Sequence, residues 1–394
     1  MATKIMYLVD HYLGPQAGTE KQLLQLVQYL DRSRYEPSMT VFRGSEYIER
    51  NLFPCPVRVL GITKLASIRT VLRIVRYVLT LRREGYRLVH CFFNDSSLIA
   101  PFFLWLFGIR ALVSRRDMGF WYTPRNVAVL RLVAPFVDRY VANSQAVKRI
   151  VQQQEWAPSG KVSVIYNGYV LHAQNSSEID DAMKLFGIAG EDPVVGIVAN
   201  LKPIKRIDTL IEAFALVNRQ YPDARLAIVG SDNLSPNGTS MLADLKGLAY
   251  RLGIHERVIF MGRLDNPIFY INRFAVAVLC SESEGFSNSI IEYMQAGRPI
   301  ICTDTGGNPE LVQDGCNGFL IPVGDSGALA DRLVRLLSDS ALACRLGEAA
   351  RKTVQSLYTH THMVSEQMAC YDDVLSDGRS GWKFYRWLGR PRRC

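Results

Sequence analysis

The chain lacks a regular cysteine pattern. Its eight cysteines are scattered over 394 residues, and none of them forms a CxxC pair. Several stand inside apolar runs such as AVAVLC and PIIC, which favours reduced thiols in a protein core. A disulfide framework or zinc site is therefore not expected, and we assign no metal ligands.

A hydrophobic run long enough to cross a membrane is also missing. The uncharged run LIAPFFLWLFGI covers only residues 98–109 and contains Pro101, and twelve residues cannot span a bilayer. It predicts a buried helix or, alternatively, a segment that inserts shallowly into a membrane. The N-terminal sequence MATKIMYLVDHYLG enters a strand-like run without the apolar block and cleavage site of a secretory signal. We therefore expect a cytoplasmic protein.

Acidic residues are outnumbered by basic ones. The chain has 46 Lys and Arg against 37 Asp and Glu, which gives a formal net charge of +9. Such an excess indicates an anionic partner. Nucleic acid is not expected as that partner, because no helix-turn-helix, zinc-finger or RNP-like signature accompanies the charge.

Part of this charge lies on a predicted helix and at the C-terminus. In the predicted helix, Arg69, Arg73 and Arg76 line one face, and another face carries a helically spaced apolar stripe of Ile68, Val71, Leu72, Val75, Val78 and Leu79. The last seventeen residues, GRSGWKFYRWLGRPRRC, hold six basic side chains and no acid. Both features are typical of binding to an anionic membrane surface, here at the inner face of the membrane. A solvated helix face and an unstructured tail explain them equally well.

Strands and helices alternate in two series along the chain. The first series has the predicted strands KIMYLVD, PSMTVF, YRLVHCFF, ALVSRR and DRYVANS, and the second has VVGIVAN, RLAIVG, RVIFMG, AVAVLC and RPIICT. This alternation predicts an α/β fold of two doubly wound, Rossmann-like domains that face a central cleft. We expect an N-terminal domain at 1–170, a polar linker at 171–193, and a second domain at 194–365. Residues 366–394 would form a C-terminal helix and a basic tail that packs back on the N-terminal domain.

A dinucleotide-binding signature is absent after the first strand. The loop DHYLGPQAGTEKQ does not match GxGxxG, and no acid follows at the expected distance. Gly14 and Gly18 still precede a helix, so backbone amides could approach a phosphate there. A plain turn is the alternative.

The segment EGFSNSIIE follows the strand AVAVLC and places a helix start between two acids. Ser287 is the predicted N-cap, so the helix begins between Glu284 and Glu292. Amides from Gly285 to Asn288 would attract an anion, best a phosphate or diphosphate. Ionised carboxylates accept hydrogen bonds from hydroxyls. A ligand with hydroxyls at both ends and phosphates between them is a nucleotide sugar.

Three cations follow the first strand of the second domain. The loop ANLKPIKRID supplies Lys202, Lys205 and Arg206, which could neutralise a leaving diphosphate without a metal. A solvated helix start would also explain them.

The block from Val194 to Asp325 resembles a known family. It contains VANLKPIKRIDTLIEAF, VIFMGRLDN and SESEGFSNSIIEYMQAGRPIICTDTGGNPELVQDGCNGFLIPVGD, and it is similar to the donor-binding domain of the retaining glycosyltransferases of family 4 (glycosyl transferases group 1), which have the GT-B fold. The first domain is similar through AGTEKQL, VANSQAV and VIYNG. The resemblance implies transfer of a hexose-type sugar from a UDP- or GDP-sugar to a hydroxyl of a glycan or lipid-linked acceptor, with retention and without a metal or other cofactor. Surface polysaccharide or glycolipid synthesis would be the setting.

The resemblance also implies roles for individual residues. Glu284, near the donor hexose, and Lys205, on the diphosphate, would be catalytic, while Glu292 would bind the ribose. The other implied substrate-binding residues are Gly285, Phe286, Ser287 and Asn288 through their amides, Gly18 of the first domain, Lys202 and Arg206 near the phosphates, and Arg263 and Leu264 on the base.

Two positions depart from the family pattern. Asn200 stands where the family often has Arg, so Lys202 or Arg206 would replace that cation. The loop SRRDMG stands where the family commonly offers a His to the donor sugar, which makes Arg116 and Asp117, with their neighbour Arg115, candidates without an assigned role.

Other protein classes remain open from the sequence. A glycoside hydrolase also uses two carboxylates, but it needs no phosphate site between them. A nucleotide-sugar epimerase shares the fold and the donor. A non-catalytic nucleotide-sugar-binding protein is a third class, because Asn200 could signal lost activity.

The basic tail gives a first prediction. Removal of residues 379–394 should weaken binding to anionic vesicles, because it deletes cations and aromatic side chains that favour a membrane interface. Co-sedimentation of the full and truncated chains with such vesicles measures this. Equal sedimentation of both would contradict it.

Overall fold

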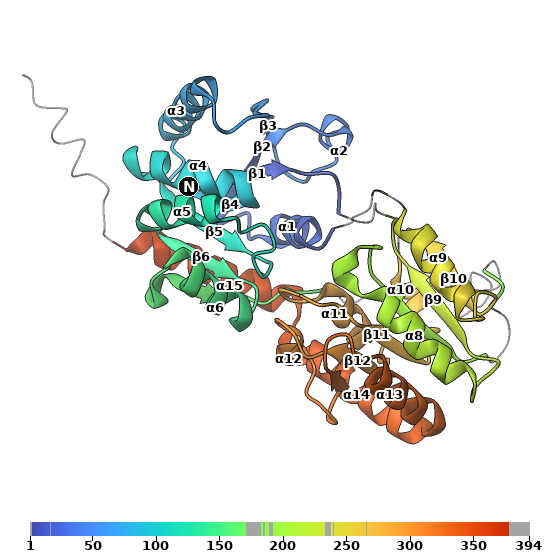
Figure 1. Cartoon of the computed structure of the whole chain (residues 1–394). Coiled ribbons are helices and arrows are strands. Elements are labelled where there is room, and N and C mark those ends of the chain that lie inside the picture. Colours follow the sequence, from blue (N-terminus) through green and yellow to red (C-terminus); the bar gives the residue numbers. More distant parts are fainter. Residues whose placement is uncertain are drawn as a thin grey trace, which may run out of the picture. The chain divides into compact units, whose positions relative to one another are not determined.

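The computed structural model describes residues 2–15, 17–170, 183, 186–188, 192–232, 238, 240–264 and 266–377. These residues form two compact units (Figure 1). Unit 1 consists of Met1–Gly168 and His360–Cys394, and unit 2 is Tyr169–Thr359. Most of the expected linker at 171–193, and the basic tail from residue 378 onward, lie outside the described residues.

Unit 1 contains one parallel sheet with helices on both faces. The strands pair in the order β3-β2-β1-β4-β5-β6-β7. Its elements are β1 (Thr3–His11), α1 (Gly18–Tyr29), β2 (Tyr35–Arg43), α2 (Glu46–Glu49), β3 (Val57–Val59), α3 (Ile68–Arg83), β4 (Leu88–Phe92), α4 (Asn94–Leu106), β5 (Arg110–Arg115), α5 (Pro124–Val133), η1 (Ala134–Phe136), β6 (Arg139–Ala142), α6 (Gln145–Glu155), η2 (Ser159–Lys161), β7 (Val162–Val164) and α15 (His360–Ser376).

The two faces of this sheet bury different helices. Side chains alternate along a strand, so Met6 and Leu8 of β1 join the core under α3, α4, α5 and α6, whereas Tyr7 and Val9 join the core under α1 and α15. Helix α15 buries Met363, Tyr371 and other side chains in that second core. The expected domain boundary at residue 365 falls inside α15, whose whole length belongs to unit 1.

Unit 2 is built in the same way. Its strands pair in the order β10-β9-β8-β11-β12-β13, all parallel. Its elements are β8 (Val194–Val198), η3 (Pro203–Lys205), α8 (Ile207–Asn218), β9 (Arg225–Val229), α9 (Met241–Arg251), β10 (Val258–Gly262), α10 (Ile268–Ile271), β11 (Val276–Leu279), α11 (Asn288–Gln295), β12 (Ile300–Thr303), α12 (Asn308–Leu311), β13 (Phe319–Ile321), α13 (Ser326–Ser338) and α14 (Ser340–Leu357). The prediction of two doubly wound α/β domains is confirmed.

Each sheet has one topological switch point, where the strand order changes direction. In unit 1 it lies between β1 and β4, and in unit 2 between β8 and β11. Loops that leave adjacent strands in opposite directions leave room at the carboxyl ends of those strands, where α/β proteins bind ligands. The site should therefore be sought at these two positions.

Helix α3 buries a different face from the expected one. Its core side chains are Thr70, Ile74, Tyr77, Val78 and Leu81. Of the expected apolar stripe only Val78 is fully buried, while Ile68 and Leu72 are exposed. The helix has apolar residues on two faces, and the sheet takes the one with Tyr77, whose ring fills more of the core. The run at 98–109 lies mainly in α4, where Ala100 and Leu104 are buried but Phe102 and Trp105 are partly exposed.

A buried polar chain joins α15 to the sheet of unit 1. The two ring nitrogens of His90 lie 2.9 Å from the Tyr371 hydroxyl and 2.8 Å from the Ser114 hydroxyl, and Tyr371 donates to Tyr7 at 3.2 Å. Burial, together with the charge of Arg116, lowers the pKa of His90 to about 3. The imidazole therefore stays neutral in the folded protein at pH values where an exposed histidine is charged.

This chain predicts acid sensitivity of unit 1. Below pH 6.5 the unfolded state binds a proton at His90 that the folded state does not, so stability present above that pH is lost as the pH falls toward 3, with a limiting slope of about 1.4 kcal/mol per pH unit. Urea midpoints measured against pH should fall less steeply for His90→Gln than for the wild type. Burial raises the pKa of Asp10 to about 6, so the effect of pH on stability through Asp10 has the opposite sign. This effect is the same in the wild type and in His90→Gln, so it cancels when the two slopes are compared.

The exposed His255 of unit 2 supplies the control. His255→Gln should keep the wild-type slope. Identical slopes for all three proteins would contradict the assignment to His90.

Candidate functional site

At the switch point of unit 2, side chains of α11 bind the backbone at the end of β8. The β8–β11 ladder pairs only Val195 and Gly196 of β8. Beyond it, the Val198 N–H donates to the Tyr293 hydroxyl at 2.7 Å, and the Val198 carbonyl accepts from Ser289 at 2.7 Å. The backbone groups of β8 that would have continued the ladder are thus satisfied by a helix. The Tyr293 hydroxyl also donates to the Val278 carbonyl of β11 at 3.2 Å, so it bridges the two strands beyond the end of their ladder.

Lys205 and Glu284 meet at this switch point. Lys205 ends η3, in the loop after β8, and Glu284 lies in the loop after β11. The Lys205 ammonium lies 2.6 Å from Glu284 Oε1, which also accepts from the Ser281 hydroxyl at 2.7 Å. The two side chains are 23% and 12% exposed, so the pair is largely shielded from water yet reachable. The structure thus brings the two expected catalytic residues together.

The loop around Glu284 rests on a glycine pair after β12. The Gly307 N–H donates to the Glu284 carbonyl at 3.1 Å. Gly306 has φ +53°, and a Cβ atom there would lie 1.8 Å from the same carbonyl oxygen. Only glycine fits both the backbone angle and the space. The segment TGG therefore fixes where Glu284 lies.

Helix α11 begins where the sequence predicts. Ser287 is its N-cap, and the Ser287 hydroxyl accepts from the Ile290 N–H at 3.4 Å. Phe286 is buried, with its ring edge-to-face against Tyr358. The positive end of the α11 dipole thus begins four residues after Glu284, which is paired with Lys205.

Glu292 is held by a phenol. It lies on α11 with 8% exposure, and the Tyr169 hydroxyl donates to Glu292 Oε1 at 2.9 Å. Burial, with the nearby carboxylate, raises the pKa of Tyr169 well above 10, so the phenol is a donor. Carboxylate oxygens have several lone pairs, so Glu292 can accept further hydroxyls beside Tyr169. No sequence motif indicated Tyr169, because it stands 123 residues before Glu292.

The other expected donor-binding residues of unit 2 also lie in loops at the carboxyl ends of its strands. Lys202 and Asn200 are in the loop after β8, and Asn200 Oδ1 accepts from the Ser231 N–H at 3.2 Å. Arg206 pairs with Asp208 at 3.2 Å, so part of its charge is already neutralised. Arg263 and Leu264 directly follow β10, at the edge of the sheet.

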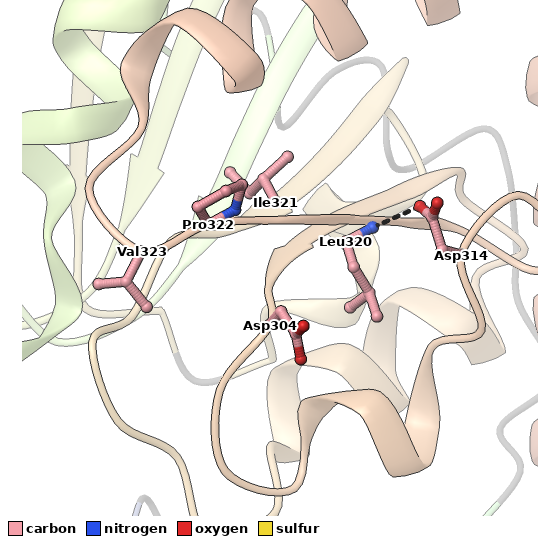
Figure 2. A pocket seen from close by; sticks show the side chains of 6 residues that line it. All are labelled: Asp304, Asp314, Leu320, Ile321, Pro322 and Val323. Atoms are coloured by element: carbon pink, nitrogen blue, oxygen red, sulfur yellow. Dashed lines mark hydrogen bonds between the residues drawn. The ribbon is translucent and has the colours of Figure 1, made fainter.

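A hollow beyond β12 and β13 was not predicted. It has a cavity volume of about 560 Å³ and is lined by Asp304, Asp314, Leu320, Ile321, Pro322 and Val323 (Figure 2). Asp314 Oδ1 accepts from the Leu320 N–H at 2.9 Å. The hollow adjoins the Glu284 loop, because Thr305, next to Asp304, donates to the Glu282 carbonyl at 3.0 Å. Acceptor-only carboxylates suit a ligand rich in hydroxyls.

In unit 1, the last residue of β5 is a structural cation, and the residue after it is a less neutralised cation. Arg115 forms an ion pair with Glu155 at 2.6 Å, and both side chains are buried, so its role is structural. Arg116 donates to Asn167 Oδ1, and no carboxylate of the described residues lies within ion-pair distance of it. Burial lowers the pKa of Arg116 to about 10. Asp117 accepts from the Gly119 N–H at 2.7 Å, and burial raises its pKa.

Two asparagines join Arg116 at the carboxyl ends of neighbouring strands. Asn143, after β6, donates to the Arg116 carbonyl at 3.2 Å, and its buried Oδ1 has no hydrogen-bond partner among the described residues. Asn167 follows β7. They belong to the motifs VANSQAV and VIYNG, although neither motif indicated a role for its asparagine. Gly18 is the first residue of α1, after the switch point of unit 1.

Two family models match the chain. The model described as Glycosyl transferases group 1 matches residues 178–353, and the model described as Glycosyltransferase Family 4 matches residues 17–172. The first match covers most of unit 2, with Lys205, Glu284 and Glu292, and the second covers most of unit 1.

Curated relatives share about half of their length with the chain. An N-acetyl-alpha-D-glucosaminyl L-malate synthase of Bacillus anthracis is 31% identical over 57% of this chain and 57% of its own length. A D-inositol 3-phosphate glycosyltransferase of Mycolicibacterium smegmatis is 28% identical over 62% of this chain and 54% of its own. Among solved structures, Anabaena Alr3699/HepE in complex with UDP and glucose is similar with a TM-score of 0.81 at 22% identity, covering 94% of this chain and 100% of that one. Its likeness shows the GT-B fold.

The contact between Gly306 and Glu284 predicts the effect of a single methyl group. Gly306→Ala should displace the Glu284 loop and destabilise unit 2 by several kcal/mol, because the Cβ atom overlaps a backbone oxygen. Gly315→Ala is the matched control, since Gly315 also has positive φ (+73°) but nothing lies within 4 Å of the place that a methyl group would take there. It should cost only the left-handed backbone penalty of about 1 to 2 kcal/mol.

Urea denaturation of both variants measures the difference. An equal loss of stability for Gly306→Ala and Gly315→Ala would show that the loop moves without cost.

Proposed function

We propose that this chain, which belongs to the glycosyltransferases of group 1 and family 4, moves a hexose-type sugar from a nucleoside diphosphate donor to a hydroxyl of a glycan or lipid-linked acceptor. The observation that carries the proposal is the contact of Lys205 with Glu284 beside the start of α11. It combines a cation, a helix N-terminus and a carboxylate at one switch point. A diphosphate next to a sugar needs these three groups.

Lys205 and α11 would bind the diphosphate. When the bond between the anomeric carbon and the diphosphate breaks, negative charge grows on the departing oxygen. The Lys205 ammonium and the α11 dipole stabilise that charge from fixed positions, which is the electrostatic contribution that enzymes use most. We propose on this basis that the reaction needs no metal.

Glu284 and Glu292 would bind hydroxyls at the two ends of the donor. A phosphate oxygen at Lys205 competes with Glu284 for the ammonium, which frees Glu284 to accept from hexose hydroxyls. Glu292, held by Tyr169, would accept from the ribose. The two glutamates are thus assigned different tasks.

We propose that the anomeric configuration is retained. The acceptor oxygen forms its bond to the anomeric carbon on the face from which the diphosphate departs, and the acceptor proton passes to a diphosphate oxygen. This sequence balances without a side-chain nucleophile. Glu284 is the alternative nucleophile, because it lies beside the proposed hexose position.

The acceptor and the site of action rest on charge and on the relatives. The named relatives are, by their names, a synthase of a glucosaminyl compound and a glycosyltransferase, and an acceptor in surface polysaccharide or glycolipid synthesis would suit a basic protein. No helix among the described residues is long and apolar enough to cross a bilayer. We propose a cytoplasmic protein that associates peripherally with the inner face of a membrane through its positive charge.

A nucleotide screen tests the proposal. UDP-, GDP- and other nucleotide sugars are added to the purified chain, UDP-sugars first because the Anabaena structure holds UDP, and thermal stabilisation is measured. At least one donor should stabilise the chain. Glu292→Ala should weaken the binding of that nucleotide by about 10- to 100-fold, because a hydrogen bond to a charged group contributes about this much to affinity. Glu256→Ala, an exposed glutamate of unit 2, should bind like the wild type.

The sugar transfer itself is measured with the same protein preparation. With the stabilising donor and a membrane extract as acceptor, transfer should persist in EDTA, and proton NMR of the product should show the donor's anomeric configuration. Stabilisation by no nucleotide would overturn the proposal, and an inverted product would overturn retention alone.

A further inference from the structure

The outer surface of helices α3, α4 and α5 carries apolar side chains where polar ones are the rule. These helices form one layer over the sheet of unit 1, because Ile74, Ala100 and Val133 belong to one buried cluster with strand β1 (Figure 1). Their solvent side faces away from the sheet. The large apolar residues exposed on that layer are Ile68 (73%), Leu72 (51%), Phe102 (38%), Trp105 (41%) and Leu132 (73%).

The same layer is almost free of acid. Helix α3 has five arginines and no carboxylate in sixteen residues, and α5 has two arginines and no carboxylate. The one acid of α4, Asp95, is paired with Arg43 at 3.1 Å. Arg69, Arg76 and Arg83 are exposed, and no carboxylate of the described residues pairs with them. The positive charge of this surface is therefore not neutralised from within.

On α3 the apolar and basic residues form adjoining strips. At about 100° per residue, Ile68, Leu72 and Leu79 fall within about 40° of one another, and Arg83, Arg76 and Arg69 occupy the next 40° or so. Arg73, at the margin, donates to the carbonyls of Leu60 and Gly61 at 2.8 and 2.6 Å, which holds the preceding loop against the helix. The surface is thus a fixed amphipathic face.

We propose that the outer face of α3, α4 and α5 docks unit 1 on an anionic lipid bilayer. The apolar side chains enter the boundary between headgroups and acyl chains, and the arginines bind lipid phosphates. Trp105 has the amphipathic ring that is enriched at this depth. The inference rests on the proposed membrane association and names the surface responsible for it.

A bilayer fits this face better than a protein partner. The apolar residues come from three helices, with Phe102 and Trp105 in one aromatic cluster with Phe136, and Leu132 on another helix, and a fluid interface can enclose such an uneven set of side chains. A protein partner would need a complementary surface and carboxylates placed against each arginine, whereas anionic lipids move laterally to meet the cations.

Paired substitutions test the face in the full chain. Arg69→Glu with Arg76→Glu, and separately Ile68→Ser with Leu72→Ser, change exposed side chains only, so both variants should fold. Vesicles of mixed phosphatidylcholine and phosphatidylglycerol serve as the probe, and co-sedimentation is measured. Each pair should reduce the bound fraction about tenfold or more, since two cations or two inserted side chains are lost.

Matched controls lie in unit 2. Arg219→Glu with Arg251→Glu, and Leu216→Ser with Leu252→Ser, change exposed residues of the other unit, and these variants should sediment like the wild type. The α3 pairs should also weaken binding when residues 379–394 have been removed, which separates this face from the tail.

Three outcomes would overturn the inference. They are unchanged sedimentation of the α3 variants, binding of the wild type that does not depend on anionic lipid, and no vesicle binding by the wild type, as expected if a protein covers this face. Nucleotide stabilisation is measured on each variant and should stay unchanged. A chain that docks through α3 but is stabilised by no nucleotide would contradict the transferase proposal and leave this one standing.

Discussion

The candidate site depends on how the backbone of Val198 is satisfied. This residue lies at the carboxyl end of β8, past the point where the β8–β11 ladder stops, and its N–H and carbonyl bind Tyr293 and Ser289 of α11. An unpaired backbone group costs about 1 to 3 kcal/mol when it is buried, and Val198 is half-buried. The helix supplies both partners, and the Tyr293 hydroxyl also donates to the Val278 carbonyl of β11. Lys205 and Glu284 lie in the loops that leave these two strands, so the hydrogen bonds of α11 fix the strand ends from which both side chains are held.

The two switch points use a helix N-terminus in opposite ways. In unit 1, the start of α4 is occupied by the protein's own anion: the buried Asp10 carboxylate accepts from the N–H groups of Asn94, Asp95 and Ser96. A second anion there would meet a carboxylate and filled donors. In unit 2, the cap of α11 is the neutral hydroxyl of Ser287, and the Glu284 carboxylate in the loop before it is paired with Lys205. This difference favours unit 2 for the proposed diphosphate, although both sheets reverse their strand order in the same way.

Much of this arrangement could be predicted from the sequence, because its signals are local. The α/β alternation, the cap at Ser287 and the cations of ANLKPIKRID each depend on a few consecutive residues. The residues that these segments contact in the folded protein cannot be predicted from such short stretches. Tyr169 reaches Glu292 across 123 positions, and Arg115 turns out to be half of a buried ion pair with Glu155, forty positions away. The hollow near Asp304 is lined by a residue that follows β12 together with residues in and around β13. Such contacts are set by the register of the whole sheet, which no single segment specifies.

Helix α3 shows a more general limit of pattern analysis. A periodic pattern indicates that an apolar face will be covered, but it does not say by what, since a sheet and a bilayer select for the same side chains. Ile68 and Leu72 satisfy the helical period as well as Ile74 and Val78 do, yet only the second pair lies in the core. The arginines distinguish the two faces, because Arg69, Arg76 and Arg83 have no carboxylate partner among the described residues and favour an anionic surface outside the protein over its apolar interior. A helix with two apolar faces and charges of one sign therefore indicates that one face packs on the protein core and the other contacts a membrane. It need not be interpreted as a helix whose apolar periodicity is irregular.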